Sequence, residues 1–164
     1  MEAVAVEQLV DETLALCLEA MKTTGVKLET DFSELPESYE VHGRRVQLSQ
    51  VLLNLISNAF FAVANRPGAR IRIAARTLRG EADESFVEIV VEDNGPGVPK
   101  EIRERVFEPF FTTKPVGQGT GLGLSIAASV MREHGGHLIL DESVDSDWTT
   151  RFIVKLPVLV AEPV

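Results

Sequence analysis

The chain has 164 residues, of which 45% are hydrophobic and 25% charged. This length and balance are typical of one globular domain and exclude a disordered or fibrous protein. A net charge of -9 disfavours nucleic acid and anionic membranes as partners, because both bind proteins through clustered Lys and Arg.

The first 43 residues predict one helix and two strands. Residues 6–22 carry apolar side chains at helical spacing, and Gly25 follows as the expected end of the helix. Cys17 on this helix is the only cysteine, which excludes an intrachain disulfide and a cysteine metal cluster and fits a reducing compartment. Residues 26–32 alternate apolar and polar side chains as a half-buried strand does, and we expect a short strand around 39–41 to pair nearby.

The middle of the chain predicts a second helix and a strand pair. Residues 45–64 are helical in pattern and apolar on nearly all faces, so we expect this helix to be buried. No stretch approaches the ~20 apolar residues of a membrane span. Residues 70–77 and 86–91 read as strands joined by a charged hairpin at 80–84, and most of 93–123, rich in glycine and proline, is expected to be loop.

A third helix and two strands complete the chain. The helix covers residues 124–134 and ends at Gly135-Gly136, and the strands cover 137–141 and 149–156. Because strands outnumber helices and do not alternate regularly with them, we predict an α+β fold. We expect a two-layer α/β sandwich in which about three helices cover one face of a mixed, mostly antiparallel sheet of about five strands.

Two asparagines on the second helix carry the first chemical signal. Asn54 and Asn58 lie four residues apart, so both amides share one helix face. A buried amide without a partner costs a few kcal/mol, so something is expected to satisfy them. A polar network in the core and a metal or ligand site both fit this pair.

A carboxylate follows the strand at 86–91. Asp93 precedes Asn94-Gly95-Pro96-Gly97, where the two glycines would let a ligand approach the backbone. An Asx-type turn explains this segment as well as a ligand site does.

A second glycine segment leads directly into the third helix. Gly117, Gly119, Gly121 and Gly123 alternate with other residues, so the loop offers bare amides to anionic oxygens at a helix start. A flexible linker is the alternative, but linkers seldom end in so apolar a helix.

An aromatic segment, Phe107 to Lys114, lies between the two glycine segments. Its phenylalanines fit either core packing or a contact surface. The three histidines, His42, His134 and His137, sit at turns, caps or strand starts and have no catalytic setting.

In this order the four segments closely resemble the ATP-binding catalytic domain of sensor histidine kinases. Residues 50–59 resemble the asparagine box, 93–97 the first glycine box, 107–114 the phenylalanine box and 117–125 the second glycine box. The resemblance covers roughly residues 6–157 and implies one domain over 1–164, with ATP between a helix and a mobile lid at about 98–120.

The resemblance also implies a role for each motif residue. Asp93 would accept a hydrogen bond from the adenine amino group, with Gly95 and Gly97 giving the base room. Asn58 would coordinate Mg²⁺, with Asn54 beside it and Lys114 supplying positive charge to the phosphates. Three phenylalanines would anchor the lid: Phe107, Phe110 and Phe111. The remaining nucleotide contacts would come from Val98, Phe107, Gly119, Thr120, Gly121, Leu122 and Gly123.

The implied reaction is transfer of the ATP γ-phosphate to a histidine on a separate dimerisation domain, in a two-component system with a response regulator receiver domain. In related ATPases and in anti-sigma-factor serine kinases, the residue at the position corresponding to Asn54 looks like a glutamate that acts as a base. Asn54 is an amide that cannot take a proton, which favours histidine as the acceptor. A stand-alone serine/threonine kinase of the anti-sigma-factor type is the main alternative, and a nucleotide-sensing module without catalysis is another.

Several features depart from the family pattern. Phe61 and Ala62 stand where many members carry a basic residue, so Lys114, Arg66 or a partner would have to supply that charge. Thr149 replaces the usual glycine before the final strand. No histidine lies in a phosphoacceptor-like segment, so the chain is expected to be an excised, monomeric, cytoplasmic domain of a protein that is free to be membrane-anchored elsewhere.

Overall fold

The computed structural model describes residues 1–36, 39–81, 84–143 and 147–158. Within these residues one sheet holds five strands in the order β2-β4-β5-β7-β6, and a second, two-stranded sheet pairs β1 with β3. The strands are β1 (Glu2–Ala5), β2 (Lys27–Glu34), β3 (Glu40–Gly43), β4 (Arg70–Arg79), β5 (Ser85–Asp93), β6 (His137–Leu140) and β7 (Thr150–Pro157).

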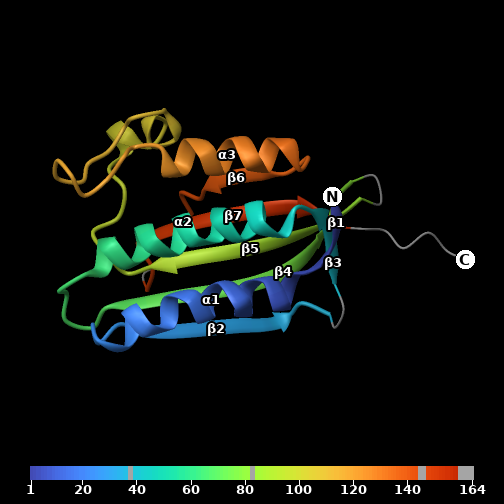
Figure 1. Ribbon diagram of the computed structural model, residues 1–164, viewed down its shortest axis with the longest axis horizontal. Coiled ribbons are helices and arrows are strands. Elements are labelled where there is room, and N and C mark those ends of the chain that lie inside the picture. Colours follow the sequence, from blue (N-terminus) through green and yellow to red (C-terminus); the bar gives the residue numbers. More distant parts are fainter. Residues whose placement is uncertain (37–38, 82–83, 144–146, 159–164) are drawn as a thin grey trace, which may run out of the picture.

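Three α-helices of the described chain cover one face of the larger sheet: α1 (Val6–Lys22), α2 (Arg45–Val63) and α3 (Gly123–Glu133) (Figure 1). β2 and β4 run parallel, and the other pairs are antiparallel. The predicted α+β sandwich with a mixed, mostly antiparallel sheet is therefore confirmed.

The core lies between the helix layer and the sheet. Alternate residues of β4, including Ile71 and Ile73, point into it because successive strand side chains face opposite sides. They meet buried side chains of α1 and α2, such as Leu9 and Leu52.

The other sheet face has no helix over it among the described residues and is covered by charged pairs. Glu92 is fully buried there, and it accepts hydrogen bonds from the guanidinium groups of Arg72 and Arg151. The guanidinium groups of Arg70 and Arg72 lie over the buried Trp148 ring, 4.8 and 5.1 Å from its centre.

Helix α2 is less buried than its sequence predicts. Seven of its residues, from Leu48 to Val63, are buried, but Val46 is 82% exposed and Phe61 is 43% exposed. By length and composition alone α2 is apolar enough to cross a membrane, contrary to our expectation, yet its buried face packs on the sheet as in a core helix.

Two local features were not predicted. The strand β1 is too short to stand out in the sequence. It pairs with β3, which is the short strand that we expected around residues 39–41. Two 3-10 turns, Lys100–Ile102 and Arg105–Phe107, interrupt the expected loop. The predicted hairpin at 80–84 closes with the Gly80 amide donating to the Glu84 carbonyl, but residues 82–83 of it lie outside the described residues.

The two ends of the described chain meet at one end of the sheet. Val158, just after β7, forms an isolated antiparallel bridge with Val41 of β3, which also pairs with β1. The segment 98–120 lies at the opposite end of the molecule (Figure 1).

Candidate nucleotide-binding site

The two asparagines of α2 contact two different segments. The Asn54 amide Nδ2 donates to the carbonyl of Gly123 over 3.1 Å, at the start of α3. The Asn58 side-chain oxygen Oδ1 accepts a hydrogen bond of 3.1 Å from the ammonium of Lys114. One face of α2 thus joins the second glycine segment to the aromatic segment.

Asp93 is a carboxylate at the end of β5, and only 3% of it is exposed. Burial raises its pKa to about 6, because the charged form loses hydration. The Gly95 amide, which donates to Asp93 Oδ1 over 2.8 Å, and the Thr150 side chain oppose this shift by stabilising the charge.

Gly95 packs against the end of α2. A Cβ at this position would lie 2.9 Å from the Ala62 carbonyl oxygen, which is closer than real Cβ contacts. The room around Gly95 is therefore used by the helix itself, and this contact holds the turn after Asp93 on α2.

Thr149, for which we expected no ligand role, fixes the same turn. The Thr149 hydroxyl donates to the Gly95 carbonyl over 2.7 Å, and the Thr149 amide donates to the Asp93 carbonyl over 3.0 Å. Asn94 holds the other side, because its Oδ1 accepts from the Arg70 amide over 2.8 Å.

The three phenylalanines of the lid segment differ in their packing, contrary to the expectation that all three anchor it. Phe107 packs edge-on against Phe152 of β7 with ring centroids 6.2 Å apart. Phe111 lies under the Arg105 guanidinium, 4.6 Å away. Phe110 is 75% exposed, so its side chain anchors nothing in this conformation.

The second glycine segment is held by its own polar contacts. The Thr120 hydroxyl accepts from the Leu122 amide over 3.3 Å, and the Leu122 carbonyl accepts from the Ser125 hydroxyl. Gly121 has φ +69°, and a Cβ there would overlap the backbone of Phe110. The two loops of the lid region therefore touch through Gly121.

Lys114, at the end of the aromatic segment, brings a positive charge to Asn58 of α2. Burial lowers the Lys114 pKa from its ordinary value, because the ammonium is partly desolvated. At the other end of the lid segment the Val98 carbonyl accepts from Arg103 Nε over 3.0 Å.

A sequence model of the family described as "Histidine kinase-, DNA gyrase B-, and HSP90-like ATPase" matches residues 43–160. The chain belongs to this family. Within it, the motifs and relatives are those of the ATP-binding catalytic domain of sensor histidine kinases.

Curated relatives of the chain are two-component sensors. The chain is 41% identical over 121 residues to the two-component sensor PprA of Pseudomonas aeruginosa, covering 71% of this chain and 12% of PprA. It is 37% identical over 134 residues to the sensory histidine kinase/phosphatase NtrB of Rhizobium leguminosarum, covering 73% of this chain and 34% of NtrB. The chain thus spans a minor part of these relatives.

Solved structures agree along nearly the whole chain. The nucleotide-free catalytic domain of histidine kinase ThkA superposes with a TM-score of 0.78 at 29% identity, covering 96% of this chain and 98% of that one. ThkA in complex with the response regulator protein TrrA gives a TM-score of 0.74 at 27% identity, covering 95% of this chain and 41% of that one.

The histidine kinase fold brings several predicted site residues together. Contacts link Asn58 to Lys114 and Asn54 to Gly123, and Asp93 lies beside Gly95. Sequence reasoning missed the positioning contacts of Thr149 and Asn94. Thr149 departs from the family pattern. The segment that contains Asn94 was expected to form a turn, and this expectation gave no sign that its side chain accepts from the Arg70 amide.

Proposed function

We propose that this domain binds Mg²⁺-ATP and transfers the γ-phosphate to a histidine of a separate dimerisation domain. The contacts of Asn54 and Asn58 carry the proposal, because they join the asparagine, phenylalanine and second glycine segments around one face of α2. In that arrangement the glycine amides and the α3 N-terminus are available to phosphate oxygens.

The adenine end is assigned to Asp93. A buried carboxylate at a strand end is suited to accept a hydrogen bond from the adenine amino group. Thr149 and Asn94 hold the turn at Gly95, and in this proposal Gly97 and Val98 would line the base from the same loop. The phosphates would then extend toward Thr120, Leu122 and the glycines Gly119, Gly121 and Gly123.

The residues present fit Mg²⁺ as a shared ion. Among the described residues no group of three or more His, Cys, Asp or Glu could hold a metal. Asn58 offers one amide oxygen, which accepts from the Lys114 ammonium with one lone pair and keeps the second for a metal ion. Mg²⁺ is commonly held by one or two protein oxygens plus substrate phosphates and waters, and it would neutralise phosphate charge during transfer.

Asn54 supports histidine as the acceptor. Its Nδ2 donates to the Gly123 carbonyl, which an ionised carboxylate could not do, and the amide cannot act as a base. A neutral imidazole nitrogen is nucleophilic without such a base. Its attack forms a bond to the γ-phosphorus and breaks the bond to the β,γ-bridging oxygen, which releases ADP.

The proposed partners follow from this chemistry. They are the dimerisation domain of the same protein and a response regulator receiver domain, as in the ThkA complex with TrrA. We place the domain in the cytoplasm, where ATP is available, as a monomer when isolated.

The test is transfer of labelled phosphate from ATP to an added dimerisation domain. We expect acid-labile, alkali-stable phosphate on that domain, and none with Asp93→Ala. Acid-stable phosphate would indicate a hydroxyl acceptor and favour the serine/threonine kinase alternative. Equal labelling by Asp93→Ala would contradict the adenine assignment.

A further inference from the structure

Three residues surround the Lys114 side chain: Asn58, Phe61 and Gly119. We call this arrangement the Lys114 seat and its three residues the walls. The ammonium Nζ donates to Asn58 Oδ1 over 3.1 Å and lies 4.8 Å from the centre of the Phe61 ring. Gly119 forms the third wall, because a Cβ there would come within 2.8 Å of Lys114 Cδ.

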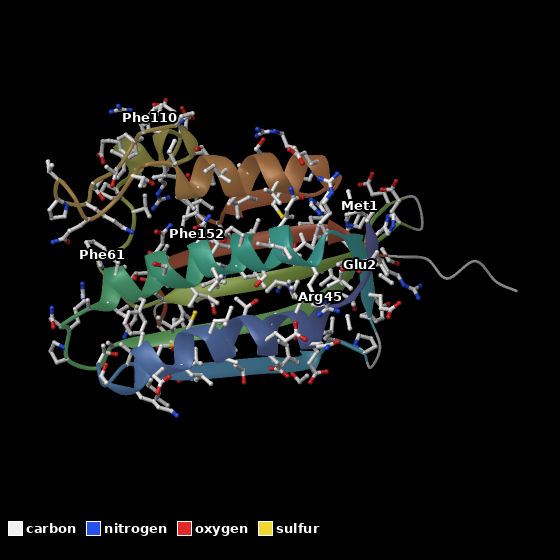
Figure 2. The ribbon with its side chains drawn as sticks, viewed as in Figure 1. Met1, Glu2, Arg45, Phe61, Phe110 and Phe152 are labelled. Atoms are coloured by element: carbon white, nitrogen blue, oxygen red, sulfur yellow. The ribbon has the colours of Figure 1, made fainter. Side chains whose placement is uncertain are left out.

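Two walls of the Lys114 seat come from α2 and one from the lid. Asn58 and Phe61 are three residues apart, so they are neighbours on one face of the helix. Figure 2 shows Phe61 at the end of α2 that faces the lid. Lys114 and Gly119 belong to the lid segment, so the seat connects the lid to the helix.

Core packing does not explain why residue 61 is a phenylalanine. It is 43% exposed, although a phenylalanine at the surface loses most of the benefit of burial. A cation within about 6 Å of an aromatic ring centre is attracted to the negative face of the ring. The Lys114 contact therefore gives this ring a role that burial does not.

We propose that Phe61 is a positioning residue, which holds the Lys114 ammonium beside Asn58 and so presents a cation from the lid to the ATP polyphosphate. The inference rests on the proposed function, in which the phosphates lie between α2 and the second glycine segment. Holding a lysine side chain in one conformation costs rotamer freedom. In the Lys114 seat this rotamer freedom is already lost in the free domain, so it is not lost again when the nucleotide binds.

A double-mutant cycle on nucleotide affinity tests the proposal. Calorimetry with Mg²⁺-ATP would compare Phe61→Leu in the wild-type background and in a Lys114→Met background. We expect Phe61→Leu to weaken binding about two- to fivefold when Lys114 is present and to have no further effect when it is absent. Phe61→Trp, which keeps an aromatic face, should restore wild-type affinity.

Two outcomes of these affinity measurements would overturn the inference. One is an absence of coupling between Phe61 and Lys114, such as an equal loss from Phe61→Leu in both backgrounds, which would mean that the ring acts on the fold of α2. The other is failure of Phe61→Trp to restore affinity while Phe61→Leu remains impaired. Thermal unfolding of each variant checks that the compared proteins are folded.

A measurement without nucleotide examines the seat directly. In the free domain, NMR should show the Lys114 ε-methylene protons shifted upfield by the Phe61 ring, and Phe61→Leu should remove this shift. Gly119→Ala should also reduce it, because the new Cβ displaces the lysine stem. Unshifted Lys114 resonances in the wild-type domain would refute the seat.

The outcomes separate this inference from the proposed function. If the wild-type domain binds no ATP, both fail. If it binds ATP and Asp93→Ala does not, while the cycle shows no coupling between Phe61 and Lys114, only the inference fails.

Discussion

Asp93 concentrates the electrostatics of the site in one residue. Its carboxylate is buried at the end of β5 and receives the Gly95 amide, yet burial still raises its pKa to about 6. The folded domain therefore keeps a charge in a place that disfavours it. Such a cost is common where a residue is retained for binding.

We expect ATP affinity to fall as the pH falls through the Asp93 pKa, because the protonated carboxyl is a poor acceptor for the adenine amino group. With a pKa of about 6, the charged fraction drops about fourfold between pH ~7.5 and pH ~5.5. Calorimetry at the two pH values should show a comparable loss in affinity.

Asp93→Asn is the matched control, because it keeps the shape and cannot titrate. Its weaker affinity should lack this component of the pH dependence. Since the wild-type pKa lies above the usual 3.8, stability from Asp93 is present below that value and is lost as pH rises through about 6. Asp93→Asn should therefore be the more stable protein near pH ~7.5, and a less stable variant there would contradict the burial argument.

At the scale of elements, His134 joins two helices. It is 5% exposed at the end of α3, and its Nε2 accepts from the amide of Arg44, which precedes α2. Its Nδ1 lies 2.7 Å from the Val130 carbonyl, so the tautomer that satisfies both contacts is neutral with the proton on Nδ1. The histidine thus has a structural partner at each nitrogen.

We expect His134→Ala to destabilise the domain by about 1–3 kcal/mol, because the Arg44 amide loses its acceptor and a cavity forms. Urea unfolding measures the change. His137→Ala is the control: this residue is exposed on β6, and its loss should change stability by less than about 0.5 kcal/mol. Equal effects of the two substitutions would refute the structural role of His134.

Most elements could be predicted because their signals are local. Periodicity placed α1, α2 and β5 within a few residues of their observed bounds. Strand β1 could not be found, since four residues carry little pattern and its partner β3 is distant in sequence. The exposure of Phe61 and Phe110 was also missed, because periodicity gives a face but not what covers it.

For the site, the motif positions were predictable and their contacts were not. The spacing of Asn54 and Asn58 placed them on one face, but the partners Gly123 and Lys114 lie far along the chain. Thr149 could not be recognised as the residue that holds Gly95, because a hydroxyl that bonds a distant carbonyl leaves no trace in local sequence.

At the scale of the whole molecule, the sandwich and the segment 98–120, which we propose as a lid, differ in burial. The sandwich holds the buried core, whereas neither 3-10 turn of the lid segment contains a buried residue. Elements with few buried contacts open at lower free energy than the core. If the segment 98–120 is a lid as we propose, we expect it to open without loss of the sheet.

Gly121→Ala should loosen the lid selectively, because φ is +69° there and a Cβ would overlap the Phe110 backbone. Hydrogen exchange should become faster across residues 98–120 and remain slow in β4 and β5. Gly117→Ala is the control: its φ is also positive, at +85°, but no described atom lies within 4 Å of a Cβ there. Loss of protection throughout the sheet would contradict a separable lid.

The bridge between Val41 and Val158 brings the end of β7 next to β3, at a place where the molecule can be attached to a support. β1 and the end of β7 lie together, at the end of the molecule opposite the segment 98–120 (Figure 1). Attachment of either strand to a solid support would therefore leave the proposed nucleotide-binding site unobstructed. Fluorophores on the lid and α2 of such anchored molecules would report each opening and closing event individually.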